Sequence, residues 1–383
     1  MLGFSYKNYL SLLEAKQSKP SQAEKDNQRK CLSEDLLPGL PDHLAQVCLS
    51  LVHPSFLFSV CRSWRRLIYS PSFPPFLSLY ALFSSTHSKQ THINFHAFDP
   101  ISSHWRVLPT PSHGSSLRLL LRHPSFISRN LPVQSISVSG NLVIVAATTD
   151  NLFPALPRPL VFDPITSEWC HAPPLSTPRR WCAVGSLRGS VYVASGIGSV
   201  FSYDVAQSVE RWDPRKKAEG PGWERVSDLK DGRFCRDAID AVGWRGKLCM
   251  VNVKGESIKD GVVYDADNDT WEDMPEGMIG GWRGPVAAMD EDEMFVVDEV
   301  KGALKKYDAG RDSWAEVIES EILRGAEQIA AGGGRVCVVC SGSGGKGIVI
   351  VDVTTVPAKL WPVESPEGLE AAAVHILPRM TAS

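Results

Sequence analysis

An aspartate followed by a tryptophan recurs through most of the chain and restricts its possible folds more than any other feature. Successive aspartates lie 64, 50, 52, 43 and 44 residues apart. Four pairs share one spacing and two carry insertions: Asp99/Trp105, Asp163/Trp169, Asp265/Trp271 and Asp308/Trp314, then Asp213/Trp223 and Asp352/Trp361. Repeats of about 50 residues are typical of stacked or circular arrays of one structural unit. The sequence therefore predicts six copies of such a unit.

The residues around each pair predict a strand, a tight turn and a second strand. The short side chain of Asp favours turns, because it accepts hydrogen bonds from backbone amides ahead of it. The Trp supplies a large apolar face that we expect to pack against a neighbouring unit. Two further strand-like runs lie between pairs, for example residues 239–242 and 247–251. Four short strands in each repeat predict the blade of a β-propeller.

The two ends of the repeat region indicate how the ring closes. The first unit has strand-like runs at 79–84 and 93–99 but no inner strand before them. The C-terminal region has a spare run, residues 369–377. Completing blade one with this run removes an open sheet edge. We therefore expect a mainly β fold, with a six-bladed propeller over residues 73–383 closed by the C-terminal strand.

The segment before the propeller has a different composition. Residues 1–33 are rich in Lys, Gln, Ser and Glu, and we expect a mobile tail there. Residues 34–72 predict a small all-α hairpin, with Ser55 capping the second helix. Its two apolar stripes are Leu44/Val47/Cys48/Leu51 and Leu57/Val60/Cys61/Trp64/Ile68. Two such short helices cannot bury both faces alone, so they must pack on a third element or on a partner.

These residues resemble a known family. Leu40-Pro41-Asp42 with the run Val60–Ile68 is similar to an F-box, and the repeats resemble kelch repeats whose Gly-Gly pair is degraded, for example to Ser195-Gly196. The order of the two regions resembles plant F-box/kelch-repeat proteins over residues 34–383. The resemblance implies that a Skp-family adaptor, and through it a cullin, binds the F-box in a helix-in-groove manner. The candidate adaptor-contact or core residues are Leu40, Pro41, Leu44, Val60, Trp64 and Ile68. The connection at His53-Pro54 is shorter than in most F-boxes.

The sequence contains no recognisable catalytic constellation. Cys337 and Cys340 have a metal-like spacing, but they lie on a predicted strand, where positions three apart face opposite sides. We therefore expect no cofactor, no metal and no enzymatic activity. A net charge of −3 argues against a general nucleic-acid or anionic-membrane binder. The absence of an 18-residue apolar run or a recognisable export signal predicts a protein of the cytoplasm, the nucleus or both.

A set of arginines is the candidate partner-binding surface of the propeller. Each lies ten to thirteen residues after a repeat Trp, where the chain approaches the next inner strand: Arg180, Arg233, Arg236, Arg283 and Arg324. Equivalent positions of successive blades gather at one end of a propeller, so these side chains could bind carboxylates or phosphates of a partner. The alternative is that each Arg pairs with an acidic residue of its own blade. The connection between Trp105 and Gln134 is a second candidate, either a binding element or a disordered loop.

Three functions remain open at this point. The first is a substrate-receptor subunit of an SCF-type cullin ubiquitin ligase, whose propeller holds an unidentified protein for ubiquitination. The second is a kelch interaction scaffold whose helical hairpin only supports the propeller. The third, a propeller enzyme, would require a bound metal or a deep channel lined by His or acidic residues.

Overall fold

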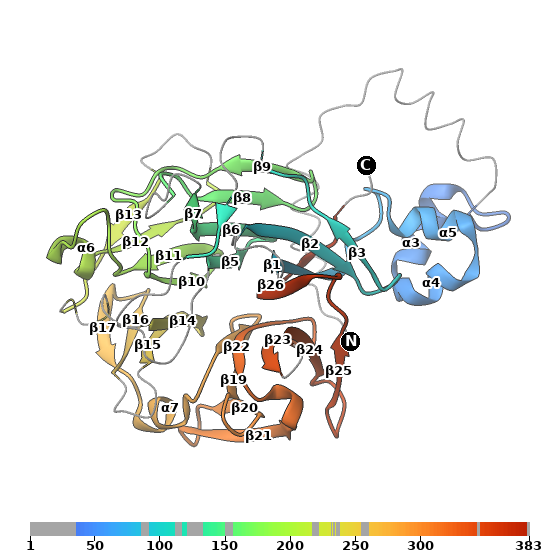
Figure 1. Cartoon of the computed structure of the whole chain (residues 1–383). Coiled ribbons are helices and arrows are strands. Elements are labelled where there is room, and N and C mark those ends of the chain that lie inside the picture. Colours follow the sequence, from blue (N-terminus) through green and yellow to red (C-terminus); the bar gives the residue numbers. More distant parts are fainter. Residues whose placement is uncertain are drawn as a thin grey trace.

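The computed structural model describes residues 36–85, 92–111, 117–120, 133–149, 156–216, 222–230, 232, 234, 238–253, 260–342 and 345–380. A ring of β-sheets forms most of the molecule, and a small helical module lies beside it (Figure 1). No helix among the described residues has both the length and the apolar character needed to cross a membrane.

Six four-stranded antiparallel sheets form the ring, which confirms the predicted six-bladed propeller. Blade 1 contains β26 (Leu369–Pro378), β1 (Leu77–Ser85), β2 (Ile93–Asp99) and β3 (His104–Val107), from the inside outward. Blade 2 contains β5 (Gln134–Val138), β6 (Asn141–Ala146), β8 (Leu160–Asp163) and β9 (Glu168–His171). Blade 3 contains β10 (Ala183–Leu187), β11 (Ser190–Ala194), β12 (Val209–Trp212) and β13 (Glu224–Val226).

The second half of the ring follows the same pattern. Blade 4 contains β14 (Ala238–Trp244), β15 (Lys247–Val253), β16 (Gly261–Asp265) and β17 (Thr270–Asp273). Blade 5 contains β18 (Val286–Met289), β19 (Glu293–Asp298), β20 (Ala303–Asp308) and β21 (Ser313–Glu319). Blade 6 contains β22 (Ala326–Gly332), β23 (Arg335–Gly342), β24 (Gly345–Asp352) and β25 (Lys359–Val363). Short elements between the blades are α7 (Glu276–Gly281) and the 3₁₀ turn η2 (Glu321–Leu323). Within blade 3, α6 (Tyr203–Gln207) lies between β11 and β12. In the connection between blades 1 and 2, β4 (Leu117–Arg118) pairs with β7 (Thr148–Thr149), which lies between β6 and β8 of blade 2.

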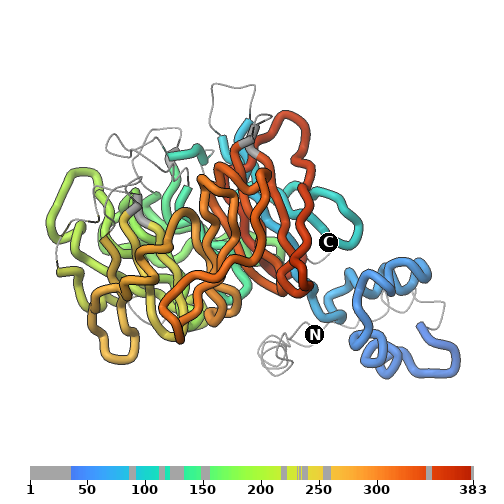
Figure 2. The backbone as a smooth tube through the Cα atoms, turned by 90° about the horizontal axis from the view of Figure 1, so that it is seen from below, coloured from blue at the N-terminus to red at the C-terminus, as the bar shows by residue number. Residues whose placement is uncertain are grey.

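The C-terminal strand forms the inner edge of blade 1. β26 pairs with β1 in an antiparallel register that sets Leu79 opposite Ile376 and Tyr80 opposite His375. Figure 2 shows these first and last strands of the propeller, in blue and red, side by side. The last strand of the chain therefore pairs with the inner side of β1, as the innermost strand of each other blade pairs with the second strand.

The repeat aspartates occupy equivalent turns in all six blades. Each carboxylate accepts a hydrogen bond from the backbone amide two residues later, at 2.8–3.0 Å. Such a turn reverses the chain between the third and fourth strands of the blade. The predicted role of the aspartates is confirmed.

The repeat tryptophans link neighbouring blades, with one exception. Five indole N–H groups donate to a backbone carbonyl of the adjoining blade or its connection, at 2.7–2.9 Å. These rings also pack against the apolar clusters between blades. Trp361 differs: its side chain is 38% exposed and lies 6.0 Å from the guanidinium of Arg335. The predicted packing role therefore holds for five of the six blades.

The core of the propeller consists of six apolar clusters, one between each pair of adjacent blades. Cys340 belongs to the cluster between blades 5 and 6, and Cys337 to the one between blades 6 and 1. Burial raises the pKa of each thiol to about 12. The two thiols point to opposite sides of β23, so they cannot hold one metal ion.

The helical module contains three described helices: α3 (Asp42–Ser50), α4 (Pro54–Val60) and α5 (Arg62–Ile68). The predicted second helix is therefore divided. The backbone of Cys61 is extended, and its Sγ accepts a hydrogen bond from the Trp64 amide, which starts a new helix. The prediction that Ser55 caps the second helix was also wrong. His53 is the cap, accepting from the Ser55 amide, and Pro54 occupies the first turn, where its missing N–H costs nothing.

The propeller has two distinct faces. At one face, the turns that follow the inner strands contact one another, as when the Arg245 amide donates to the Glu291 carbonyl. At the other face, the segment that leads into each inner strand lies beside the loop that joins the second and third strands of the same blade. In blade 3, for example, Arg180 before β10 forms backbone hydrogen bonds with Ile197 of that loop. We call the second face the loop face. The helical module precedes Leu77, which pairs with Pro378 at the end of β26 opposite the loop face, so its described helices do not cover the loop face.

Candidate functional site: two binding surfaces

The helical module has its own core and also a large exposed apolar surface. Its core includes Ala45, Leu49, Leu57, Leu67 and Ile68. The exposed surface comes from α3, α4 and the turn between them: Leu44, Val47, Leu51, Val52, Phe56 and Val60. Large apolar side chains gathered in this way on consecutive helices indicate an interaction site. The apolar stripe that the sequence predicted on α3 therefore faces outward and is not packed on the propeller.

The six residues predicted from the F-box resemblance divide into two groups. Pro41, Leu44 and Val60 are exposed and available to a partner. Leu40 and Trp64 are half-buried against the module core. The Trp64 indole also donates to the Leu36 carbonyl at 2.8 Å. Ile68 has no exposed surface, so it takes the core role and not the contact role that its pattern also allowed.

Sequence reasoning did not select Leu51 and Phe56 as contact residues, although they are the most exposed apolar side chains of the module, at 81% and 69%. Val47 is exposed as well. The helical spacing included Leu51 and Val47 in one stripe, but spacing alone does not say which stripe faces the core. Ala45, which is small, and Leu49 fill the face of α3 that points to the module core. Which face of α3 points to the core depends on α5 packing beside it.

A buried arginine holds the module on blade 1. Arg379, only 3% exposed, follows β26 and donates to the backbone carbonyls of Ser70 at 2.8 Å and Tyr69 at 3.3 Å. These carbonyls follow the last turn of α5, where backbone acceptors lack helical partners and a cation is favourable. The Tyr69 hydroxyl donates to Asp99 in the turn of blade 1, and burial together with this bond raises the pKa of Tyr69. The C-terminus of the propeller thus fixes the end of the helical module.

The described members of the predicted arginine set lie in different surroundings on the loop face. Arg324 forms an ion pair with Glu321 at 2.8 Å, which agrees with the alternative that each Arg pairs with an acidic residue nearby. Arg283 is exposed, and no side-chain partner is found for it among the described residues. Arg233 and Arg236 lie outside the described residues. The predicted set of arginines is therefore described only at three positions, and one of those three is already paired.

Arg179 and Arg180 are adjacent but have opposite environments. Arg179 is buried and forms an ion pair with the equally buried Glu210 of β12, and its guanidinium also donates to the Ser208 hydroxyl at 2.7 Å. Arg180 stacks over the Trp181 ring, with its guanidinium carbon 4.2 Å from the ring centroid. The sequence singled out Arg180 and missed Arg179. The extended backbone places neighbouring side chains on opposite sides, and only the packing shows which side is interior.

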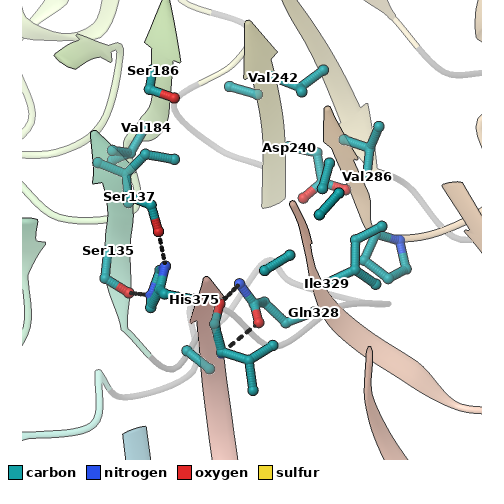
Figure 3. Close-up of a pocket in the computed structure, with 18 of the residues that line it drawn as sticks. Ser135, Ser137, Val184, Ser186, Asp240, Val242, Val286, Gln328, Ile329 and His375 are labelled. Carbon is teal, nitrogen blue, oxygen red and sulfur yellow. Dashed lines mark hydrogen bonds between the residues drawn. The ribbon is translucent and has the colours of Figure 1, made fainter. Parts of the chain in front are cut away.

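The inner strands surround a cavity of about 230 Å³ at the centre of the ring (Figure 3). The imidazole of His375 bridges β26 to blade 2 through Ser135 at 2.9 Å and Ser137 at 3.2 Å. Burial lowers the pKa of His375 to about 4, so this ring is neutral at pH 7. None of the three described arginines of the predicted set, Arg180, Arg283 and Arg324, lines the cavity. Within the described part of the chain, no group of three or more His, Cys, Asp or Glu side chains is placed to hold a metal ion.

The long connection between Trp105 and Gln134 is partly described. Leu117 and Leu120 are buried, and Leu117–Arg118 pairs with Thr148–Thr149 of the next blade. Residues 112–116 and 121–132 lie outside the described residues. Leu117 packs in the cluster between blades 1 and 2, and Leu120 packs with Ala146 and Trp181.

Comparison with known proteins decides the family. No protein-family model matches the chain. It is 50% identical over 359 residues to the F-box/kelch-repeat protein SKIP25 of Arabidopsis thaliana, covering 90% of each chain. The chain belongs to the F-box/kelch-repeat family. The F-box protein AFR of the same plant is 26% identical over 347 residues, covering 84% of this chain and 85% of AFR.

Another Arabidopsis thaliana relative of this F-box/kelch-repeat chain is the F-box/kelch-repeat protein SKIP4, which is 22% identical over 293 residues and covers 74% of each chain. These matches agree with the domain order seen in the structure. The module formed by α3, α4 and α5 is the F-box, and the six blades are the kelch propeller. The predicted family and fold are confirmed.

Proposed function

We propose that this F-box/kelch-repeat protein is the substrate receptor of an SCF-type cullin ubiquitin ligase. In this role the F-box binds a Skp-family adaptor, and through it a cullin, while the propeller binds the protein to be ubiquitinated. The chain needs no catalytic group of its own, because holding two partners together raises their effective concentration.

The exposed apolar surface of the F-box is the observation that carries this proposal. Six large apolar side chains from two consecutive helices and their connecting turn would remain in water unless a partner covered them. A helix pair laid into an apolar groove buries such side chains. If the module only supported the propeller, its apolar side chains would face blade 1. Instead these six side chains are exposed, and the contact with blade 1 includes the hydrogen bonds of Arg379 and Tyr69 and the packing of Ile101 against the module core.

The test is co-purification of the intact chain with a Skp-family adaptor. A Phe56→Ala, Val60→Ala double variant removes two exposed side chains without altering the F-box core. Burial of each side chain contributes about 1.5–3 kcal/mol, so the double variant should bind about 100-fold more weakly or worse. Val107→Ala, an equally exposed change on β3 of the propeller, is the matched control and should bind as the intact chain does.

Capture of the adaptor by a cooperatively melting intact chain, lost in the double variant, supports the receptor role. If the folded intact chain captures no adaptor, the receptor proposal fails. The scaffold interpretation, in which the short His53-Pro54 connection prevents docking, would then replace it.

The propeller would present its substrate-binding surface on the loop face. Two observations support this choice. The F-box joins the opposite end of the strands, so its described helices do not cover the loop face. Arg180 and Arg283 also lie there without carboxylate partners among the described residues, in contrast to Arg324. We expect the cytoplasm or the nucleus as the site of action, and cell fractionation would test this.

A further inference from the structure

The loop of blade 3 carries three exposed apolar side chains close together in sequence, Val200, Phe201 and Tyr203. β11 ends at Ala194 and β12 begins at Val209, so fourteen residues join the second and third strands of this blade. Val200 and Tyr203 are 74% and 69% exposed, and Phe201 is also exposed. The rings of Phe201 and Tyr203 meet edge to face, with centroids 5.2 Å apart. Exposed aromatic side chains that already contact each other are typical anchors of a protein interface.

Arg180 is fixed beside this loop by its own backbone. Its amide donates to the Ile197 carbonyl at 3.0 Å, and its carbonyl accepts from the Ile197 amide at 2.9 Å. The next residue, Trp181, has a φ of +54°, which is unfavourable for a bulky side chain. This conformation accompanies the stacking of the Arg180 guanidinium over the Trp181 ring at 4.2 Å. Local strain of this kind concentrates at binding sites, where it holds a side chain in place.

The Arg180 guanidinium has no anionic partner among the described residues. Its Nε is buried and makes no hydrogen bond there. Burial also lowers the pKa of Arg180, because the charged group has lost water without gaining a carboxylate. Arg179 shows the contrast, since Glu210 neutralises it fully inside the blade. No described residue therefore neutralises the positive charge of Arg180, and an anionic group of a ligand can do so.

We propose that Arg180 together with Val200, Phe201 and Tyr203 binds a segment of the substrate protein in which an Asp or Glu lies close to a large apolar residue. The carboxylate pairs with the guanidinium, whose planar fork fits it in a bidentate manner. The apolar side chain packs against the exposed aromatic pair of the loop. This proposal names the substrate class of the loop face and rests on the proposed receptor function.

A carboxylate suits this surface better than a phosphate group. A phosphorylated side chain carries a charge of about −1.5 to −2 at pH 7 and is bound by clusters of arginines. At this corner of blade 3, Arg180 is the one described guanidinium not already paired, because Glu210 occupies Arg179. One guanidinium balances the single charge of a carboxylate.

A random peptide library displayed on phage and selected on the purified intact chain tests the proposal. We expect the selected peptides to combine Asp or Glu with Phe, Leu or Trp. The affinity of one selected peptide is then measured by fluorescence anisotropy against Arg180→Glu, Tyr203→Ser and the intact chain. Both variants should bind at least tenfold more weakly. The matched control is Arg311→Glu, an 84% exposed arginine in the turn between β20 and β21, which should bind within twofold of the intact chain.

A charge exchange makes the test specific. A peptide whose acidic residue is replaced by Lys should bind Arg180→Glu better than it binds the intact chain. Several results would overturn the assignment: no enrichment of acidic residues, equal binding by all variants, or equal losses in Arg311→Glu. A peptide with phosphoserine in place of the acidic residue that binds more than tenfold tighter would show a phosphate site instead.

Adaptor co-purification of Arg180→Glu and Tyr203→Ser separates this proposal from the receptor function. Both variants should capture the adaptor as the intact chain does, because the F-box lies at the other end of the strands. Peptide binding without adaptor capture would contradict the receptor function alone. Adaptor capture with no peptide selectivity would contradict the loop-face proposal alone.

Discussion

Replacing Arg379 by Met should loosen the F-box from the propeller without unfolding either part. The buried guanidinium donates to the carbonyls of Ser70 and Tyr69, and its removal leaves both acceptors without these charged donors. Hydrogen bonds to charged groups contribute about 1.5–3 kcal/mol each, so the two together contribute about 3–6 kcal/mol. Met keeps much of the apolar contact, and the loss therefore reports the hydrogen bonds.

Hydrogen exchange of the α5 amides measures this loss directly, because local opening of a helix exposes its amides to solvent. A loss of about 3 kcal/mol corresponds to roughly 100-fold faster exchange, since each 1.4 kcal/mol is a factor of ten. Amides of β15, in the distant blade 4, should keep their protection.

The matched control for this prediction is Arg106→Met. Arg106 also contacts the F-box, with its guanidinium 5.5 Å from the Tyr69 ring, but it is exposed. An exposed cation–π contact contributes about 0.5–1 kcal/mol, so its loss should speed α5 exchange by less than tenfold. If Arg379→Met changes α5 exchange by no more than threefold, the account of the F-box attachment is refuted.

Three further predictions concern the propeller. Burial lowers the pKa of His375 to about 4 from 6.5, so between these pH values the unfolded chain binds a proton that the folded chain does not bind. The free energy of unfolding should therefore be at its full value above pH 6.5 and fall by about 3 kcal/mol as the pH drops to 4. Urea unfolding at pH 7.5 and 5 should show a smaller difference in His375→Gln, and an unchanged difference would exclude this residue as the cause. Arg179→Ala leaves the Glu210 carboxylate buried without its partner and should destabilise the chain by about 3–5 kcal/mol in the same assay, whereas a cost below 1 kcal/mol would disprove the pairing. Trp314→Phe removes a 2.9 Å hydrogen bond between blades and should cost about 1–3 kcal/mol, whereas Trp361→Phe should change the unfolding free energy by less than 0.5 kcal/mol.

The propeller could be predicted from the sequence because its signals are local and repeated. An aspartate that accepts from an amide two residues later needs no information from the rest of the chain. Six such turns at similar spacing imply six blades. The final strand could be assigned to blade 1 because an inner strand was missing there and an unused strand remained at the other end.

The features that sequence reasoning missed depend on contacts between distant segments. Arg179 and Arg180 are indistinguishable by residue type, and only the position of Glu210 on the third strand of the blade decides which one is buried. The division of the second F-box helix depends on Cys61 capping α5 through its sulfur, an unusual acceptor. Ile68 and Val60 share one helical stripe in the sequence, but the break between α4 and α5 gives them opposite exposures.

The central claim, that the F-box binds a Skp-family adaptor, is tested most directly by the mass of the complex in solution. Light scattering of the purified 42.0 kDa chain mixed with an equimolar purified adaptor should give one species with the summed mass of a 1:1 complex. The Phe56→Ala, Val60→Ala variant should give two separate species under the same conditions. Two separate species for the intact, folded chain would contradict the account.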